Sequence, residues 1–226
     1  MSPSVQQRRS RRRLLGWIPT AIAAAICVGV VVAAIVMQNS WWTDPERPAT
    51  ADQQAPDGMS MLGDPGIDYL TRQGALRIRI GPDSLTATEL GLAPDGPETF
   101  EPITPVQAIV VAPAGSFHVD VTRSFTVVVA SDGEVQSVQL VPESDGTWLS
   151  AISHLQRIAP YWGWTEAEID QLEDDLTIAS RAGDGRAYSA EIPPTEHKGA
   201  LASAEVAVDV TSSQVTTTFI VSRPDE

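Results

Sequence analysis

An uncharged apolar segment of 24 residues, Leu14 to Met37, constrains this chain more than any other feature. As a helix with a rise of 1.5 Å per residue it would be roughly 36 Å long, enough to cross a bilayer core of about 30 Å with some tilt. A buried helix of a soluble protein normally carries a polar stripe, and this segment has none. The sequence therefore predicts a transmembrane helix over residues 14–37.

The residues on either side of this segment predict its orientation. Residues 1–40 contain five arginines and no acidic residue. Because positive charge stays on the cytoplasmic side of a membrane, we expect residues 1–13 to form a basic cytoplasmic tail. Arginine and tryptophan favour the headgroup region at the two ends of a span. The residues expected at the membrane interfaces are Arg11, Arg12, Arg13, Trp17, Trp41 and Trp42.

A cleaved export signal is the alternative interpretation of the same region. The stretch "SRRRLLG", Ser10 to Gly16, resembles the twin-arginine export signature, which would release a secreted domain. However, the apolar run is longer than a usual signal, and its end "AIVMQNSWW" lacks the small-x-small pattern of a cleavage site. We therefore predict a retained signal-anchor, a single-pass protein of the plasma (cytoplasmic) membrane, and a C-terminal domain outside.

The composition of the remaining chain excludes several function classes. After residue 40 there are 10 basic and 29 acidic residues, a net charge of −19, and no cysteine. Such a surface repels phosphate, so nucleic acid is not expected as a partner. Thiol catalysis and disulfides are excluded as well. The chain has a single lysine against 14 arginines, and together with abundant Ala, Val, Gly and Pro this bias indicates a GC-rich bacterial genome.

Beyond the apolar segment, the sequence predicts a spacer and then one domain. Residues 38–66 are rich in Pro, Asp and Gly without periodicity, which is typical of a linker. Residues 67–226 contain alternating apolar and polar runs, as in half-buried strands, at 74–80, 107–112 and 187–192. Two hairpins are expected, one turning at Asp132-Gly133 and one over residues 203–222. The proline-rich residues 81–105 should form a surface excursion with at most a short helix over 83–90.

Two helices are expected between these hairpins. In the first, Trp148, Ile152, Leu155 and Ala159 share one face, and Pro160 should end the helix. The second should begin at Thr165 and end near residues 181–183, with a common apolar stripe formed by Ile169, Leu172, Leu176 and Ala179. The sequence therefore predicts an α+β domain in which a mainly antiparallel sheet packs on two helices, preceded by a single N-terminal transmembrane helix.

Nothing in the sequence predicts an activated nucleophile. Ser116, His118 and Asp120 are close in sequence, but alternate residues of one strand line one face without converging as a catalytic triad must. His154 lies off the apolar stripe of its helix, which indicates a surface position, and His197 falls in a polar loop. No histidine pair has the spacing of a metal motif, and no phosphate-binding glycine loop is present. We therefore expect no metal, no nucleotide and no other cofactor.

Acidic residues are abundant but carry little information by themselves. A carboxylate-based hydrolase is an alternative function, because 29 acids bring some pairs together by chance. A run of acidic residues follows the aromatic residues Tyr161, Trp162 and Trp164, and it consists of Glu166, Glu168, Asp170, Glu173, Asp174 and Asp175. These six lie on a predicted helix, which favours a solvated face over a calcium loop, and leaves a docking patch for a basic partner as the alternative.

The stretch "IAPYWGWTEAEIDQLEDD" from Ile158 to Asp175 resembles a site more than any other part of the domain. Thr165 and Glu168 have the spacing of a capping box, and Trp164 is placed to pack on Ile169. Tyr161 is expected to pack on the first helix. No neighbouring residue explains the presence of Trp162, so it is either a core anchor or an exposed ligand contact. The candidate contact residues are Trp162 and Tyr161.

Three functions remain open at this point. The first is a non-enzymatic accessory domain, held at the membrane through residues 14–37, that binds another envelope protein or a wall polymer. The second is an extracytoplasmic hydrolase with a carboxyl group of raised pKa. The third is a purely structural module. We rank them in this order, because the chain has an anchor and a spacer but no nucleophile or metal motif.

Overall fold

The computed structural model describes residues 26–27, 30, 48–144, 146–182 and 185–224. The chain divides into two compact units, Met1–Pro48 and Ala49–Glu226. Of the predicted membrane helix, the description covers Ile26, Cys27 and Val30, which are helical. Within the described residues, no helix combines the length and the apolar character that a membrane crossing needs. The predicted tail and interface residues, Arg11, Arg12, Arg13, Trp17, Trp41 and Trp42, lie outside the described residues.

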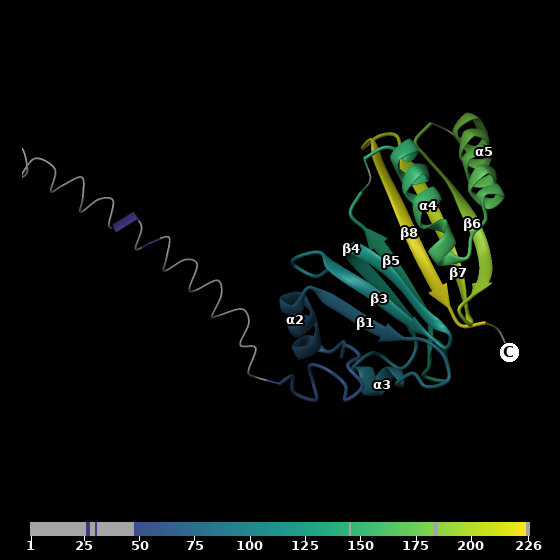
Figure 1. Ribbon diagram of the computed structural model, residues 1–226. Helices are drawn as coiled ribbons and strands as arrows, with labels where there is room; N and C mark the ends of the chain where they lie inside the picture. Colours follow the sequence, from purple (N-terminus) through teal and green to yellow (C-terminus); the bar gives the residue numbers. More distant parts are fainter. Residues whose placement is uncertain (1–25, 28–29, 31–47, 145, 183–184, 225–226) are drawn as a thin grey trace, which may run out of the picture. The chain divides into compact units, whose positions relative to one another are not determined.

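The second unit is an α+β domain built on one mixed, mostly antiparallel sheet (Figure 1). Its strands are β1 (Ala75–Arg79), β2 (Gly96–Phe100), β3 (Val106–Ala112), β4 (Gly115–Val129), β5 (Val135–Pro142), β6 (Ala187–His197), β7 (Ala200–Asp209) and β8 (Gln214–Ser222). Their order is β1-β3-β4-β5-β8-β7-β6, and β2 pairs with β4 outside this path. Only the pair of β1 with β3 is parallel among the described pairs.

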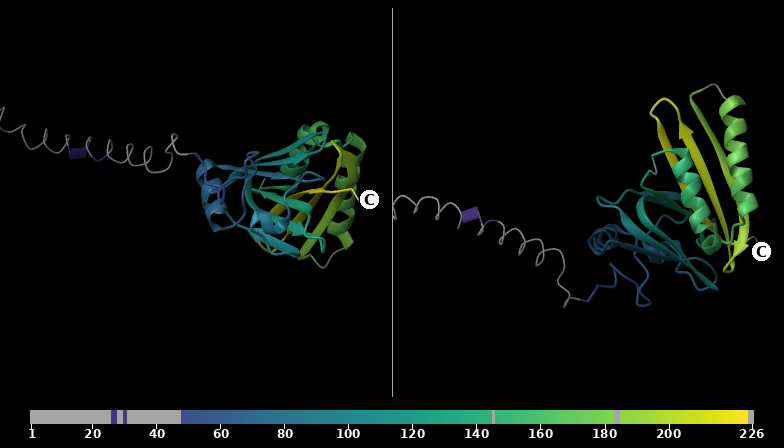
Figure 2. Two further views of the ribbon diagram at one scale, coloured as in Figure 1. Left: turned by 90° about the horizontal axis from the view of Figure 1, so that it is seen from below. Right: turned by 45° about the horizontal axis from the view of Figure 1, so that its top comes forward.

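In the described part of this unit, four helices accompany the sheet: α2 (Asp64–Gln73), α3 (Ala87–Leu90), α4 (Trp148–Trp162) and α5 (Glu166–Ala182). Both views in Figure 2 place α4 and α5 next to each other on the β6, β7 and β8 part of the sheet. Alternate residues of β7, from Ala200 to Val208, are buried, and those of β8 from Val215 to Val221 are buried too. Over β6, β7 and β8 the core therefore lies between one face of the sheet and the helix pair, and the same buried cluster continues to β1, α2 and α3. This arrangement confirms the predicted α+β class.

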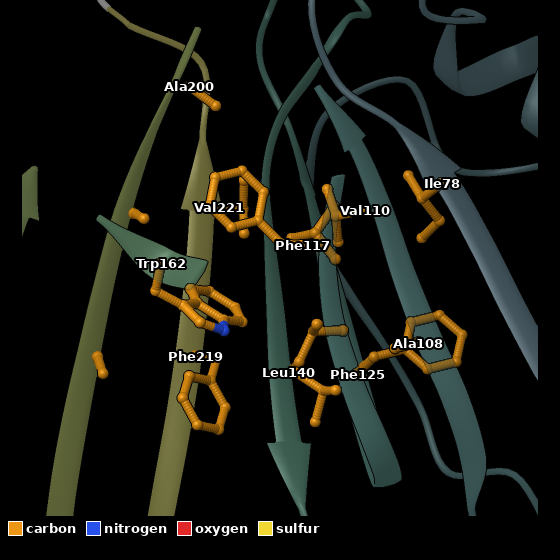
Figure 3. Close-up of a cluster of buried hydrophobic side chains, with 14 of the residues drawn as sticks. Ile78, Ala108, Val110, Phe117, Phe125, Leu140, Trp162, Ala200, Phe219 and Val221 are labelled. Carbon is orange, nitrogen blue, oxygen red and sulfur yellow. The ribbon is translucent and has the colours of Figure 1, made fainter. Parts of the chain in front are cut away.

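An aromatic row occupies the centre of this core (Figure 3). Phe117, Phe125, Trp162 and Phe219 are each at most 1% exposed. Phe125 faces Leu140 on β5, and Leu140 faces Phe219 on β8. The apolar layer therefore continues across β4, β5 and β8, and joins the two parts of the sheet into one core.

The predicted hairpins are confirmed. Gly133 has φ of 82° in the turn that joins β4 to β5, where a residue with a side chain would be strained. The hairpin of β7 and β8 pairs Leu201 through Asp209 with Ser222 through Gln214. The excursion over residues 81–105 contains the short helix α3 and also β2, which the sequence did not predict. Pro97 is tolerated there because β2 pairs only with β4 in the described sheet.

The first long helix differs from its prediction at one end. α4 runs to Trp162 instead of ending at Pro160. Gly163 caps it with φ of 81°, and its N–H group donates to the carbonyl oxygen of Ala159. Proline removes one hydrogen bond from a helix, but the buried indole of Trp162 and the glycine cap stabilise this last turn.

The predicted spacer differs as well. Residues 49–66 belong to the compact second unit, and α2 crosses the expected boundary at residue 66. Ala55, Met59 and Leu62 are buried, and Ser60 donates its backbone N–H to the carbonyl oxygen of Arg77 on β1. This part of the predicted linker therefore packs on the edge of the sheet, because burial of these three apolar side chains is favourable although prolines and acids surround them in the sequence.

Candidate functional site

The two edges of β4 are paired over different lengths, and this difference creates the candidate site. On one edge, β3 pairs with β4 between Gly115 and Thr122. On the other edge, β5 pairs with β4 only from Thr122 onward, and Pro142 is its last residue. Residues 115–121 of β4 therefore have a strand partner on one side alone within the described sheet.

A groove of ≈ 400 Å³ follows this open edge, and we call it the β4 groove. Residues 118–121 of β4 form one wall, and His154 and Ile158 of α4 form the opposite wall. Residues 142–144, at the end of β5 and beyond, close one end, and Phe219 of β8 contributes to the floor. This volume lies within the range of ligand pockets, roughly 300–1,000 Å³.

A β-bulge shapes the strand wall of the β4 groove. Between the pairs Ala108–Val119 and Val106–Thr122, the two residues Asp120 and Val121 stand opposite one residue of β3. Such a bulge bends the strand and changes where its side chains point. The side-chain amide of Gln107 donates to Oδ1 of Asp120 at 3.4 Å, and Val121 is 43% exposed. An exposed apolar side chain and a carboxylate therefore stand together at the groove rim.

The floor of the β4 groove packs on the aromatic row of the core. The ring centroid of Phe219 lies 4.8 Å from that of Trp162 and 6.3 Å from that of His154. Phe219 is 1% exposed. Since its ring packs on Trp162, the apolar core lies directly beneath the groove, whereas the rim carries Asp120 and Glu143.

Two hydrogen bonds bound the open edge of β4. At one end the ammonium group of Lys198 donates to the carbonyl oxygen of Ser116 at 2.8 Å. At the other end the backbone N–H of Glu143 donates to the carbonyl oxygen of Val121 at 3.0 Å. Ser144 contacts β8, because its hydroxyl donates to the carbonyl oxygen of Val215 at 2.7 Å.

Lys198, the single lysine of the chain, lies beside the open edge of β4. Its ammonium group also donates to the carbonyl oxygen of Tyr161 at 2.8 Å and lies 4.8 Å from the ring centroid of Phe117. Burial lowers the pKa of this group below its ordinary value. The lysine thus joins the β6–β7 turn to β4 and to the last turn of α4, where a cation suits the helix dipole.

The structure separates the two residues predicted as ligand contacts. Trp162 is 1% exposed and lies among Phe117, Trp164 and Phe219, so it is the core anchor and not an exposed contact. Tyr161 is 71% exposed instead of packing on α4. The two residues are neighbours in α4, so their side chains point in different directions from the helix. Only the indole of Trp162 reaches the sheet.

The rest of the aromatic stretch has a role in folding. Thr165 and Glu168 form the predicted capping box, in which the carboxylate accepts the backbone N–H of Thr165 at 2.7 Å. This bond is the main reason that the pKa of Glu168 is lowered. Trp164 is buried and stacks on Trp162 with centroids 5.2 Å apart, and its indole N–H donates to the carbonyl oxygen of Ala202 on β7. Trp162 and Trp164 therefore both connect the helix pair to the sheet, the first by packing on Phe219 and the second by its hydrogen bond to Ala202.

Ser116, His118 and Asp120 were expected not to converge as a triad, and of the three, Ser116 and His118 do meet. Their Oγ and Nε2 atoms lie 2.8 Å apart, within hydrogen-bond distance. Asp120 does not complete a triad in the described contacts, because its carboxylate bonds to Gln107 instead. A serine whose base lacks an orienting acid, on the outer face of a strand, is poorly activated as a nucleophile.

The other predicted polar residues do not gather into a site. Within the part of the chain that the structure describes, no group of three His, Cys, Asp or Glu side chains could hold a metal ion. His154 is half-buried in the groove wall instead of lying at the surface. His197 ends β6, with its ring 6.0 Å from that of Phe117. The acids of α5 lie on the helix outside its buried stripe, as predicted.

Sequence reasoning did not find the β4 groove, although two of its parts are visible in the sequence. Pro142 and the acidic loop after it indicate where β5 must stop. The early end of β5 leaves β4 longer than its partner, but the register that decides this comes from contacts between distant residues. Comparisons with protein-family models, curated proteins and solved structures find no match to this chain.

Proposed function

We propose that this chain is a single-pass, membrane-anchored protein of the bacterial cell envelope whose outer domain is a non-enzymatic binding module. The β4 groove is the binding surface, and the ligand is a segment of another envelope protein. The observation that carries this proposal is a groove that combines accessible apolar side chains, Val121 and Ile158, with the carboxylates of Asp120 and Glu143. Convergent polar groups around an apolar pocket are typical of ligand sites.

The chemistry around the groove favours binding over catalysis. The Ser116–His118 pair is 2.8 Å apart but has no acid bonded to the imidazole in the described contacts. A binding module needs neither an activated serine nor a carboxyl group of raised pKa.

The anchor part of the proposal rests on the sequence. Residues 14–37 are uncharged and long enough to span a bilayer, and five arginines precede them. Membrane fractionation without detergent tests this part. Recovery with the membranes supports the anchor, and recovery in the soluble fraction after loss of the N-terminal region supports a cleaved export signal.

A site-specific crosslinking experiment tests the binding part. A photoreactive amino acid replaces Val121 at the groove rim. The full chain with this replacement is expressed in bacterial cells, so that crosslinking takes place in the cell envelope. The matched control carries the same amino acid at Ile178 on α5, which is 61% exposed and outside the groove. We expect a discrete crosslinked protein from position 121 and none from position 178. Equal crosslinking at both positions, or none at position 121, would contradict a groove-bound partner.

A further inference from the structure

We propose, resting on the function above, that the β4 groove binds an extended peptide that adds a strand to the open edge of β4. The peptide carries basic side chains and lies antiparallel or parallel to residues 116–121, between this strand and α4. Peptides bind in this way in domains that present a strand edge beside a helix, where backbone hydrogen bonds supply affinity and side-chain pockets supply specificity.

The pairing of β3 with β4 determines which backbone groups face the groove. The two strands meet at Ala112 and Gly115 across a two-residue turn, and Val110 faces Phe117 two positions later. In an antiparallel pair, alternate residues exchange hydrogen bonds with the partner, and the residues between them point their N–H and C=O groups away. In such a two-residue hairpin the closing pair is hydrogen-bonded. Ser116 and His118 therefore direct their backbone groups away from β3.

The contact of Lys198 agrees with this assignment. Its ammonium group donates to the carbonyl oxygen of Ser116 at 2.8 Å, as expected if this carbonyl group takes no part in the pairing with β3. His118 is the next residue of the same parity, so its N–H and C=O groups face the groove that it lines. A strand edge with such groups is a template for pairing with another chain.

The length of the open edge limits how many peptide residues can pair with β4. The bonds of Lys198 at Ser116 and of Glu143 at Val121 mark its two ends. At about 3.3 Å per residue, the five steps between them extend over roughly 16 Å. A segment of about four or five residues therefore fits. The bulge at Asp120 and Val121 increases the local twist, so that the edge does not offer a longer flat strand to non-specific partners.

The side chains around the groove determine what the peptide carries. Residues of a strand alternate between two faces, so one set of peptide side chains meets the half-buried Ile158 and the other set meets the rim. Asp120 and Glu143 stand at the rim, and no lysine or arginine is among the described residues that line the groove. The residues after position 40 have a net charge of −19. Charge complementarity therefore favours a peptide that alternates apolar and basic residues.

Backbone-methylated peptides test strand addition without altering the protein. The probe is a capped heptapeptide that alternates valine and arginine, titrated by fluorescence anisotropy against the full chain in detergent. Two further peptides carry N-methyl groups on the valines only or on the arginines only. Because alternate N–H groups face the edge, we expect one methylated peptide to lose affinity at least tenfold and the other to bind as the parent does. Equal losses for both, or no loss for either, would overturn strand addition.

Charge variants provide a second, independent readout. In the double variant Asp120→Asn/Glu143→Gln we expect at least fivefold weaker binding of the arginine peptide and a smaller dependence on salt. A peptide with glutamate in place of arginine should bind at least tenfold more weakly to the unaltered protein. The matched control is Glu173→Gln on α5, outside the groove. Failure of every peptide to bind would overturn this inference. Crosslinking at position 121 would then still support the groove as a binding site of another kind.

Discussion

The indole of Trp162 packs on the ring of Phe219 with centroids 4.8 Å apart and the planes inclined by 34°. The first residue ends a helix, and the second contributes to the floor of the β4 groove. The helix pair and the β4 groove therefore share one aromatic contact. Changes behind the floor should act on stability, and changes at the rim should act on binding.

Replacement of Trp162 by alanine should strongly destabilise the domain. The indole is 1% exposed among three other aromatic rings, and truncation of such a side chain costs about 3–5 kcal/mol. Tyr161→Ala is the matched control, because that side chain is 71% exposed and the change should stay within about 0.5 kcal/mol. Urea unfolding followed by circular dichroism measures both. Similar losses for the two variants would contradict the burial of Trp162.

Gly163→Ala should cost more than an equivalent change at another helix cap. Gly163 has φ of 81°, and an added Cβ would lie 2.6 Å from Cγ of His197. Gly74, which caps α2, has φ of 68° and nothing within 4 Å of the same position. Gly74→Ala should therefore lose only the cost of a left-handed conformation, about 1–2 kcal/mol.

The difference between these two glycine variants isolates the clash, which we expect to add about 1–3 kcal/mol at Gly163. His197→Ala in the Gly163→Ala background should remove part of that excess in a double-mutant cycle. Additive effects of the two changes would show that the ring of His197 does not limit this turn.

The capping box at α5 should make stability depend on pH. Hydrogen bonding to the backbone N–H of Thr165 lowers the pKa of Glu168, so its contribution is present above the unfolded pKa of about 4.3. As pH falls through the lower folded pKa, that contribution is lost. Glu168→Gln should therefore cost about 0.5–1 kcal/mol at pH 7, and this difference should shrink below pH 4.3.

Asp170→Asn is the control for this pH dependence, since that exposed residue lies on the same helix beyond the cap. Its difference from the unaltered protein should be within about 0.5 kcal/mol at pH 7. A Glu168→Gln difference that stays constant between pH 7 and pH 3 would show that the carboxylate charge does not stabilise the helix start.

Ser116 should not react as a catalytic serine. Its hydroxyl lies 2.8 Å from Nε2 of His118, but Asp120 is engaged by Gln107 and does not orient the imidazole. We expect no covalent labelling by a fluorophosphonate probe, monitored by intact mass. Labelling that disappears in Ser116→Ala and also in His118→Ala would reveal an activated pair and favour a hydrolase.

Local patterns in the sequence determined much of the domain. Alternation of apolar and polar residues located the strands of both hairpins, because a half-buried strand needs this period. The spacing of Thr165 and Glu168 located the start of α5, because a capping box involves only neighbouring residues. The apolar stripe of α5 at Ile169, Leu172 and Leu176 is buried as predicted. The signals for these features lie within short stretches of the chain, so they are visible without the tertiary structure.

Only the tertiary structure decided the position of Trp162 and the existence of the β4 groove. No local pattern states whether an indole at a helix end points to the core, because this depends on how the helix packs on the sheet. The open edge of β4 depends on where β5 stops pairing, and on Lys198, 82 residues away from Ser116 along the chain. Pairing between strands and contacts between distant residues follow from the register of the whole sheet, which no single segment of the sequence encodes.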